Sequence, residues 1–491
     1  MTRLAARLRP TPLAVAPLLA LALFHPIAAR SESLPMATTL GFETAQLPDH
    51  EHMGLVGGTL LFGVGSDWWL GPAVYGAVSG SRGGFFVGGL ELQRRWPLAP
   101  GLSLATGLYA GGGGGAAAPV GGGLMLRPAL TLLKDIGPSW QLGLSWSMLR
   151  FPSGQIDSRQ LGVTMSWRSE FMHLDDAGSG GIAGQATGLG FDRMVATASS
   201  YRFEGSGRRI GLAGARAERR SSDSGFSAAF EAAAAAQGDA AGYLEILGSA
   251  AFNTEPAPSA LPGWRVGVRA GIGAGGGGAV PTGGGLMGKL AGTLEGRVAP
   301  GWTLGAEFGE VHSARGSLRA RQVQVWLGTS LEPGFDGRGE PRERRVRVEW
   351  TGTWQHHTAI ARADGSKRAL DTIGLKLDRY LDEHFYLSGQ AHSAFAGGAG
   401  AYSIGLVGAG WAGRPAARWR LGAELLAGAA GGAGVQTGGG AIVQGMAWAG
   451  WAPQARGEWR AGLGMMRAVR GGAQSPVIEL SWSRGFGMAG R

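Results

Sequence analysis

The chain has 491 residues, of which 92 are Gly and none is Cys; 16% of its residues are charged and 44% are hydrophobic. Without Cys it cannot be a disulfide-stapled small domain, and it has no thiolate zinc site. Its net charge is +10. The charges are dispersed and almost all the positive ones are Arg, so no nucleic-acid partner is predicted.

The first 29 residues have the pattern of a signal peptide. Arg3, Arg7 and Arg9 form a positive segment, residues 13–24 are apolar, and small residues follow at 28–29. The apolar stretch is shorter than an ordinary spanning helix, which favours a cleaved signal over a retained anchor. The rest of the chain contains no apolar run of about 20 residues, the length that a spanning helix needs.

Apolar residues then alternate with small or polar ones in many short segments. The pattern is clear in residues 140–148, 161–167, 264–272 and 346–351. Successive strand side chains point to opposite faces, so each segment predicts a β-strand with one apolar and one polar face. Two fold classes fit: a transmembrane barrel whose apolar face meets lipid, and a soluble sandwich whose apolar face forms the core.

The positions of the tryptophans favour the membrane barrel. Many lie at strand ends beside turns that contain Pro or Gly, where a membrane interface collects aromatic side chains. The predicted membrane-interface residues are Trp96, Trp140, Trp264, Trp302, Trp411, Trp419, Trp451 and Trp459.

The chain contains three internal repeats. A glycine block ends in a triplet that starts at Gly121, Gly283 and Gly438, and a similar strand precedes each block. Self-similarity at several aligned places indicates triplication of one unit. The first repeat predicts eight strands, at about 36–46, 54–65, 68–79, 84–96, 101–111, 123–134, 138–149 and 159–169.

The predicted organisation is a signal peptide (1–29) followed by three repeats (30–169, 195–330 and 345–491), with connectors at 170–194 and 331–344. Two architectures fit an all-β transmembrane antiparallel barrel of about 24 strands: one large barrel, or three tandem eight-strand barrels. The short connectors favour one barrel. Its wide lumen would need filling by inward glycine-rich stretches or a plug partner.

The period-two strands, the tryptophans, the signal peptide and short turns such as LDRYLDEHFYLSG from Leu377 resemble the outer-membrane β-barrel proteins of Gram-negative bacteria. The resemblance covers nearly the whole mature chain and is generic and porin-like. It implies a bacterial outer-membrane location and contact with outer-membrane lipids. One departure is that Phe486 is followed by five more residues, whereas the family usually ends on an aromatic residue.

The polar strand faces predict a wet lumen that leans positive, because Arg is frequent on them. A passive or export channel, with a possible secretion partner, is the favoured function. The alternative is a structural or adhesive surface barrel with glycine-rich loops. The candidate lumen-lining residues are Glu91, Arg95, Arg265, Arg269, Gln322, Gln324, Arg347 and Glu349.

Candidate chemistry is sparse. Residues 49–52 (DHEH) could bind a transition ion but fit a polar turn better, as do His173 with its neighbouring Asp residues and the pair His356–His357. His312–Ser313 is a remote candidate for a lipid-modifying outer-membrane hydrolase, but adjacent strand residues face opposite sides. The prediction is therefore no enzyme, with no catalytic, cofactor-binding or metal site.

Overall fold

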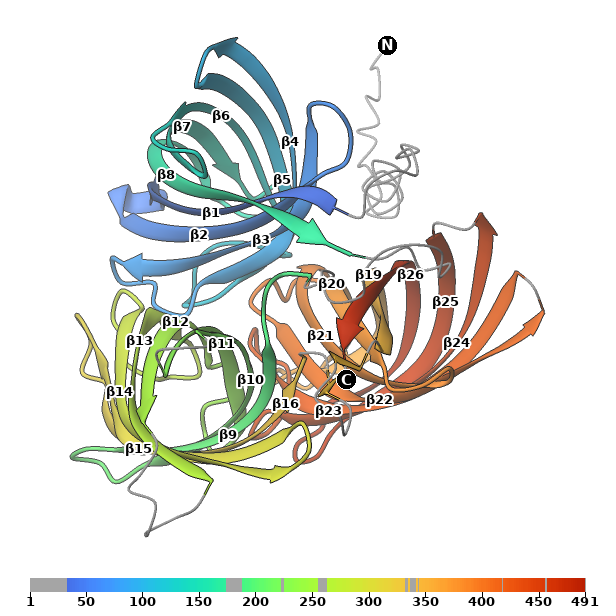
Figure 1. Cartoon of the computed structure of the whole chain (residues 1–491). Helices are drawn as coiled ribbons and strands as arrows, with labels where there is room; N and C mark the ends of the chain where they lie inside the picture. The colour runs from blue at the N-terminus through green and yellow to red at the C-terminus, as the bar shows by residue number, and fades with distance from the viewer. Residues whose placement is uncertain are drawn as a thin grey trace, which may run out of the picture.

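The computed structural model describes residues 33–490, apart from 174–187, 222–224, 255–262, 332–333, 336–340, 343, 417 and 455–456. The predicted signal peptide lies outside the described residues. The described chain folds into three closed antiparallel barrels of eight strands each, which stand beside one another (Figure 1).

Barrel 1 is built from the first repeat and confirms its eight predicted strands. Each observed strand starts and ends within three residues of the predicted bounds, because period-two alternation and turn residues define strands locally. A short 3-10 helix, η2 (Pro48–His50), joins the first two strands. The strands are β1 (Ser33–Gln46), β2 (His52–Gly63), β3 (Trp68–Ser79), β4 (Phe86–Ala99), β5 (Leu102–Gly114), β6 (Met125–Asp135), β7 (Trp140–Arg150) and β8 (Asp157–Met172).

Barrels 2 and 3 repeat this arrangement. Between their strands in the chain comes a two-strand hairpin, β17 (Gly334–Phe335) with β18 (Pro341–Arg342). Barrel 2 contains β9 (Arg193–Phe203), β10 (Arg209–Arg220), β11 (Phe226–Gln237), β12 (Leu244–Thr254), β13 (Trp264–Gly276), β14 (Leu286–Ala299), β15 (Trp302–Ser313) and β16 (Arg319–Ser330). Barrel 3 contains β19 (Arg344–Ala361), β20 (Lys367–Tyr380), β21 (Phe385–Ala396), β22 (Ser403–Ala416), β23 (Trp419–Gly431), β24 (Ala441–Gln454), β25 (Gly457–Ala468) and β26 (Gln474–Gly490).

Each barrel closes within its own repeat. The first and last strands of a repeat pair along their length: β1 with β8, β9 with β16, and β19 with β26. The preference for one large barrel was therefore wrong, and the three-barrel alternative is correct. Eight strands are enough to close a barrel around side chains. A short connector requires only that neighbouring barrels touch, not that their strands pair.

The strands direct their apolar side chains outward and many polar ones inward, the reverse of a soluble β-protein. Along β8, Leu161 and Val163 are 67% and 58% exposed on the outside, whereas Gln160 and Ser166 point inward and are 6% and 2% exposed. The same alternation recurs in β7 and β13. An apolar outside with a polar inside excludes the soluble sandwich and is the arrangement of a barrel in lipid.

The two ends of each barrel differ. The end that carries the glycine blocks, called the glycine end, holds a buried apolar core in all three barrels. In barrel 1 this core includes Tyr75, Phe85, Tyr109 and Phe151, which meet in edge-to-face pairs. The opposite end contains the strand termini beside the predicted interface tryptophans and is called the tryptophan end.

The glycine blocks are where the barrels dock on one another. The triplet of each barrel lies against the loop after the third strand of a neighbour: Gly121 O accepts a hydrogen bond from Gly400 N of barrel 3, at 3.4 Å, and Gly283 O accepts one from Gly83 N of barrel 1, at 2.8 Å. In barrel 3, Gly439 faces the end of β11 in barrel 2. The contacts thus run cyclically around the three barrels.

Two constraints favour glycine in these blocks. The first residues of the triplets, Gly121, Gly283 and Gly438, have φ of 60°, 63° and 62°. A Cβ on Gly400 would come within 2.6 Å of the backbone of Gly123 in barrel 1, closer than real Cβ atoms approach. The glycine blocks therefore serve a left-handed backbone and close approach between barrels.

A second contact joins barrels 1 and 3 through aromatic side chains. Phe171 of β8 lies between Phe62 of β2, Trp350 of β19 and Phe486 of β26, with ring centroids 5.3, 5.7 and 5.4 Å away in edge-to-face orientation. Phe486, the last aromatic residue of the chain, is 7% exposed. This aromatic cluster covers the outward side of β19 at Trp350.

Candidate functional site

The structure places the eight candidate lumen residues on inward strand faces, but in three separate interiors. Barrel 1 holds two of them, barrel 2 holds four, and barrel 3 holds two. Most are buried in contacts with other side chains, and Glu349 is fully buried. The residues do not line one common lumen. They are Glu91 and Arg95 in barrel 1, Arg265, Arg269, Gln322 and Gln324 in barrel 2, and Arg347 and Glu349 in barrel 3.

Barrel 1 is crossed by a bidentate ion pair. Arg127 of β6 donates to the two carboxylate oxygens of Glu43 of β1, at 2.8 and 2.7 Å. The Ser147 hydroxyl also donates to Glu43, at 2.8 Å, and the Gln160 amide donates at 3.4 Å. The pair is buried, and such a pair tolerates burial better when further hydrogen bonds satisfy it, as Ser147 and Gln160 do for the Glu43 carboxylate.

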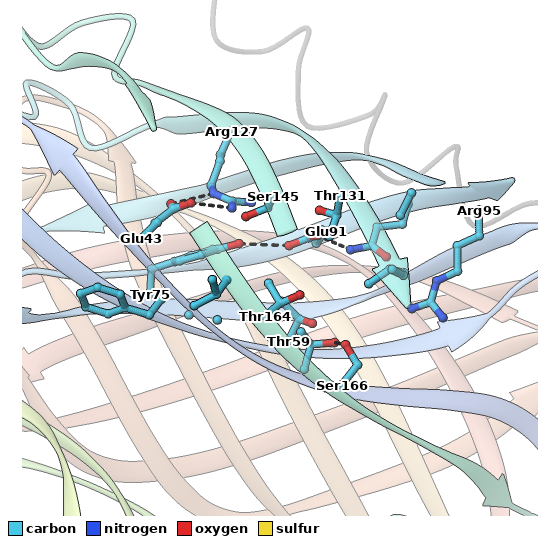
Figure 2. A pocket seen from close by; sticks show the side chains of 18 residues that line it. Glu43, Thr59, Tyr75, Glu91, Arg95, Arg127, Thr131, Ser145, Thr164 and Ser166 are labelled. Atoms are coloured by element: carbon cyan, nitrogen blue, oxygen red, sulfur yellow. Dashed lines mark hydrogen bonds and ion pairs between the residues drawn. The ribbon is translucent and has the colours of Figure 1, made fainter. Parts of the chain in front are cut away.

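A polar cavity lies on the tryptophan-end side of this pair. Its volume is about 50 Å³, enough for a few water molecules. Figure 2 shows Glu91 in the wall between the Glu43–Arg127 pair and Arg95. Glu91 accepts hydrogen bonds from Tyr75, at 3.1 Å, and from a side-chain amide two residues along β4.

Barrel 2 is filled by a network centred on Glu218. Its carboxylate contacts three guanidinium groups, those of Arg193, Arg216 and Arg269, and the last two lie 2.6 and 2.9 Å away. Arg216 and Arg269 also reach Glu307, at 2.7 and 3.2 Å. A cavity among these side chains measures about 10 Å³.

Barrel 3 has an equivalent centre at Glu349. The Arg347 and Arg420 guanidinium groups lie 2.7 Å from its carboxylate, and Arg460 forms a third ion pair with it. A second cluster joins Lys376 to Asp378 and a further buried carboxylate on β23. Every barrel thus contains a buried layer of ion pairs in addition to its apolar core.

Several partners in these networks were not among the predicted site residues. The missed residues share one sequence signal: each lies on the polar face of an alternating strand, in phase with inward neighbours. Their roles could not be read from sequence because the partners are far apart; 84 positions separate Glu43 from Arg127. They are Glu43, Arg127, Arg193, Arg216, Glu218, Glu295, Lys376, Asp378, Arg420, Glu458 and Arg460.

The networks change two expectations about the lumen. In barrel 2 the buried Arg193, Arg216 and Arg269 and the paired Lys289 face five buried carboxylates, so positive charge does not predominate among these residues. The carboxylates are those of Glu218, Glu231, Glu245, Glu295 and Glu307. Nor is there one wide lumen, so the reason for expecting a plug partner disappears.

The side chains that the sequence offered as metal ligands do not form a metal site in the described structure. His50 contacts Gln46, and Glu51 pairs with Arg82. The two Asp residues beside His173 lie outside the described residues. Within the described part of the chain, no group of three or more His, Asp or Glu side chains could hold a metal.

The two histidine pairs also differ from a catalytic arrangement. The expectation of a loop at His356–His357 was wrong, since both residues belong to β19 and His357 is fully buried in the barrel. Strand β19 runs past Trp354 because its pairing with β20 and β26 continues. His312 is exposed and contacts Glu310 at 3.1 Å, on the face opposite Ser313.

The eight predicted interface tryptophans all lie at the tryptophan end. They project outward and are exposed or half-buried; Trp419 is the most exposed, at 50%. Exposed charged residues such as Arg209, Asp364 and Arg470 lie at the glycine end instead. The outer surface therefore has an aromatic girdle at one end, an apolar band beside it and a charged rim at the other end.

Closed antiparallel barrels with an apolar outside, polar interiors and an aromatic girdle define a protein of the transmembrane β-barrel class. Among the described residues, no helix is long and apolar enough to cross a bilayer.

No protein-family model matches the sequence, and no characterised protein matches it in sequence. Among solved structures, the chain is similar to OccK11 (OpdR) of Pseudomonas aeruginosa, with 9% identity, 93% of this chain and 96% of that chain covered, and a TM-score of 0.22. It is similar to the NanC porin, with 8% identity, coverage of 60% and 100%, and a TM-score of 0.17. It is also similar to the siderophore receptor PirA of Acinetobacter baumannii, with 8% identity, coverage of 94% and 81%, and a TM-score of 0.29. The assignment of three closed barrels rests on the strand pairing within this chain.

Proposed function

We propose that the protein is an integral outer-membrane protein of a Gram-negative bacterium, embedded through three filled barrels. The apolar bands of the barrels contact lipid acyl chains, and the charged glycine end projects into water. In this proposal the protein serves as a structural surface barrel, and the glycine blocks hold its parts together.

The observation that carries the proposal is the filling of the interiors. Each barrel has an apolar core at the glycine end and a buried ion-pair layer below it. Cavities in barrels 1 and 2 measure about 50 and 10 Å³, room for only a few waters. Eight-strand barrels are just wide enough for side chains to fill.

A channel is the second candidate, and the polar lining favours it. Ion pairs can exchange partners, and a rearranged layer in barrel 1 would join its cavity to water at both ends. In this second proposal the protein is a narrow channel that the present arrangement closes.

Single-channel recording separates the two functions. Purified full-length protein is inserted into planar bilayers in symmetric salt. The structural proposal expects no steady conductance from the wild-type protein, provided that folding is verified by faster migration of the unboiled sample on a detergent gel. A steady open level from folded protein would contradict it and support the channel.

A further inference from the structure

Two opposite charges line the cavity of barrel 1 without pairing. The buried Glu91 carboxylate accepts hydrogen bonds from Tyr75 and Gln93, both neutral, and no cation among the described residues lies within ion-pair distance. The Arg95 guanidinium lies over the Trp69 ring, 4.0 Å from its centroid, and has no ion pair in the described structure. Both side chains are part of the same cavity wall (Figure 2).

The geometry of β4 keeps these two charges apart. They are four residues apart on the inward face of one strand, which separates their Cα atoms by about 13 Å. The Glu43–Arg127 pair in the same barrel is by contrast bidentate. The cavity therefore has one anionic and one cationic end.

Hydroxyl groups in the wall add unused hydrogen-bonding capacity. The Thr59 and Thr164 hydroxyl oxygens are buried, contribute to the same cavity and have no hydrogen-bond partner in the described structure. A buried polar atom without a partner and an uncompensated charge are both costly, so this wall favours a polar occupant.

We propose that this cavity binds a small zwitterion of the α-amino acid class. Its ammonium group lies at Glu91 and its carboxylate lies at Arg95. The threonine hydroxyls accept from the ammonium N–H groups or donate to the carboxylate oxygens. Such a ligand compensates both charges and adds no net charge to the interior. The cavity volume of about 50 Å³ restricts the class to its smallest members.

The test uses glycine as the probe and the full-length protein folded in detergent. Isothermal titration calorimetry is expected to show saturable binding of glycine. Acetate lacks the ammonium group and glycinamide lacks the carboxylate, so each is expected to bind at least about tenfold more weakly. These three titrations need only the wild-type protein, so they decide the matter even if a variant fails to fold.

Two variants and a matched control locate the site. Glu91→Gln and Arg95→Gln are each expected to weaken glycine binding at least about tenfold. Arg94→Gln removes the neighbouring outward guanidinium, which stacks on Trp96 outside the barrel, and is expected to leave binding unchanged. The proposal is overturned if glycine does not saturate by about 100 mM, if acetate and glycinamide bind as tightly, or if the Arg94 variant loses as much affinity as the other two.

Discussion

At the scale of single residues, the barrel interiors depend on carboxylates that each hold several guanidinium groups. Glu218 and Glu349 are fully buried, and each contacts three Arg side chains. The desolvation cost of a buried charge is offset only while its partners stay in place. Removing one of these carboxylate charges is therefore expected to lower the free energy of unfolding more than removing an exposed ion pair does.

This gives a stability prediction for barrel 2. Glu218→Gln leaves three buried guanidinium groups short of one negative charge and is expected to lower the free energy of unfolding by about 3–5 kcal/mol. Urea unfolding of the protein in detergent, followed by tryptophan fluorescence, measures the change. Glu310→Gln removes an exposed carboxylate from the same barrel and is the control, with an expected change below about 0.5 kcal/mol. Equal effects of the two substitutions would contradict the central role of Glu218.

A second residue-scale prediction concerns the turn between β1 and β2, outside the apolar band. Arg82 donates hydrogen bonds to both oxygens of Glu51, at 2.6 to 3.0 Å, and the Ser81 hydroxyl donates another. These bonds hold the pKa of the Glu51 carboxyl below its ordinary value of 4.5. The stabilisation from this pair is therefore present above pH 4.5 and is lost as the pH falls through the lowered pKa.

Carbon NMR of the Glu51 carboxyl over a pH titration measures this directly. The expected midpoint is below 4.5 in the wild-type protein and moves upward in Arg82→Gln, because that substitution removes the hydrogen bonds that contribute most to the shift. A wild-type midpoint at or above 4.5 would show that the contact does not form in solution.

At the scale of elements, the close contact between barrels depends on glycines, which have no Cβ. Gly431, at the end of β23, faces the β11–β12 loop of barrel 2, and an added Cβ would lie 2.8 Å from the Gly242 Cα. Its φ is not in the left-handed region, so the constraint is the approach of the neighbouring barrel and not backbone strain.

Gly431→Val is therefore expected to separate barrels 2 and 3 at the glycine end without unfolding either. Nitroxide labels at Ser206→Cys and Val469→Cys report the separation by pulsed electron spin resonance, since the chain has no Cys of its own. The expected result is a longer and broader distance distribution. Gly405→Val is the control, because nothing lies within 4 Å of a Cβ built on this exposed glycine. An unchanged distribution in the Gly431 variant would remove this glycine from the contact between barrels.

At the scale of the whole molecule, the outer surface predicts how the protein sits in a bilayer. The apolar band lies beside the tryptophan girdle, and the charged rim lies at the glycine end. Two residues of barrel 2 that are both exposed in the structure should then differ in contact with water. Phe308 is 64% exposed in the apolar band, and Ser206 is exposed in the loop between β9 and β10.

Phe308→Cys in proteoliposomes is expected to resist a water-soluble maleimide, because lipid covers the position, whereas Ser206→Cys is expected to react when it faces the outer solution. In urea both should react fully, which controls for the intrinsic reactivity of each thiol. Rapid labelling of folded Phe308→Cys in the bilayer would contradict the membrane-embedded arrangement.

The sequence by itself determined the strands and their faces. Residues 159–169 and 138–149, for example, were predicted as strands with the correct outward side chains. Period-two alternation and turn residues act within about twenty positions of the chain, so both can be read locally. The triplets at Gly121, Gly283 and Gly438 revealed the three repeats in the same way.

Only the tertiary structure decided which strand closes which barrel and which charges meet. A strand edge offers the same backbone hydrogen bonds to any partner, so the sequence of β8 does not distinguish β1 from β9. Most ion-pair partners of Glu43 and Glu218 lie on other strands, which come close only when the barrel closes. The role of the glycine blocks was hidden for the same reason: the backbone atoms that exclude a Cβ at Gly123, Gly285 and Gly440 belong to a neighbouring barrel, more than a hundred residues away in the chain.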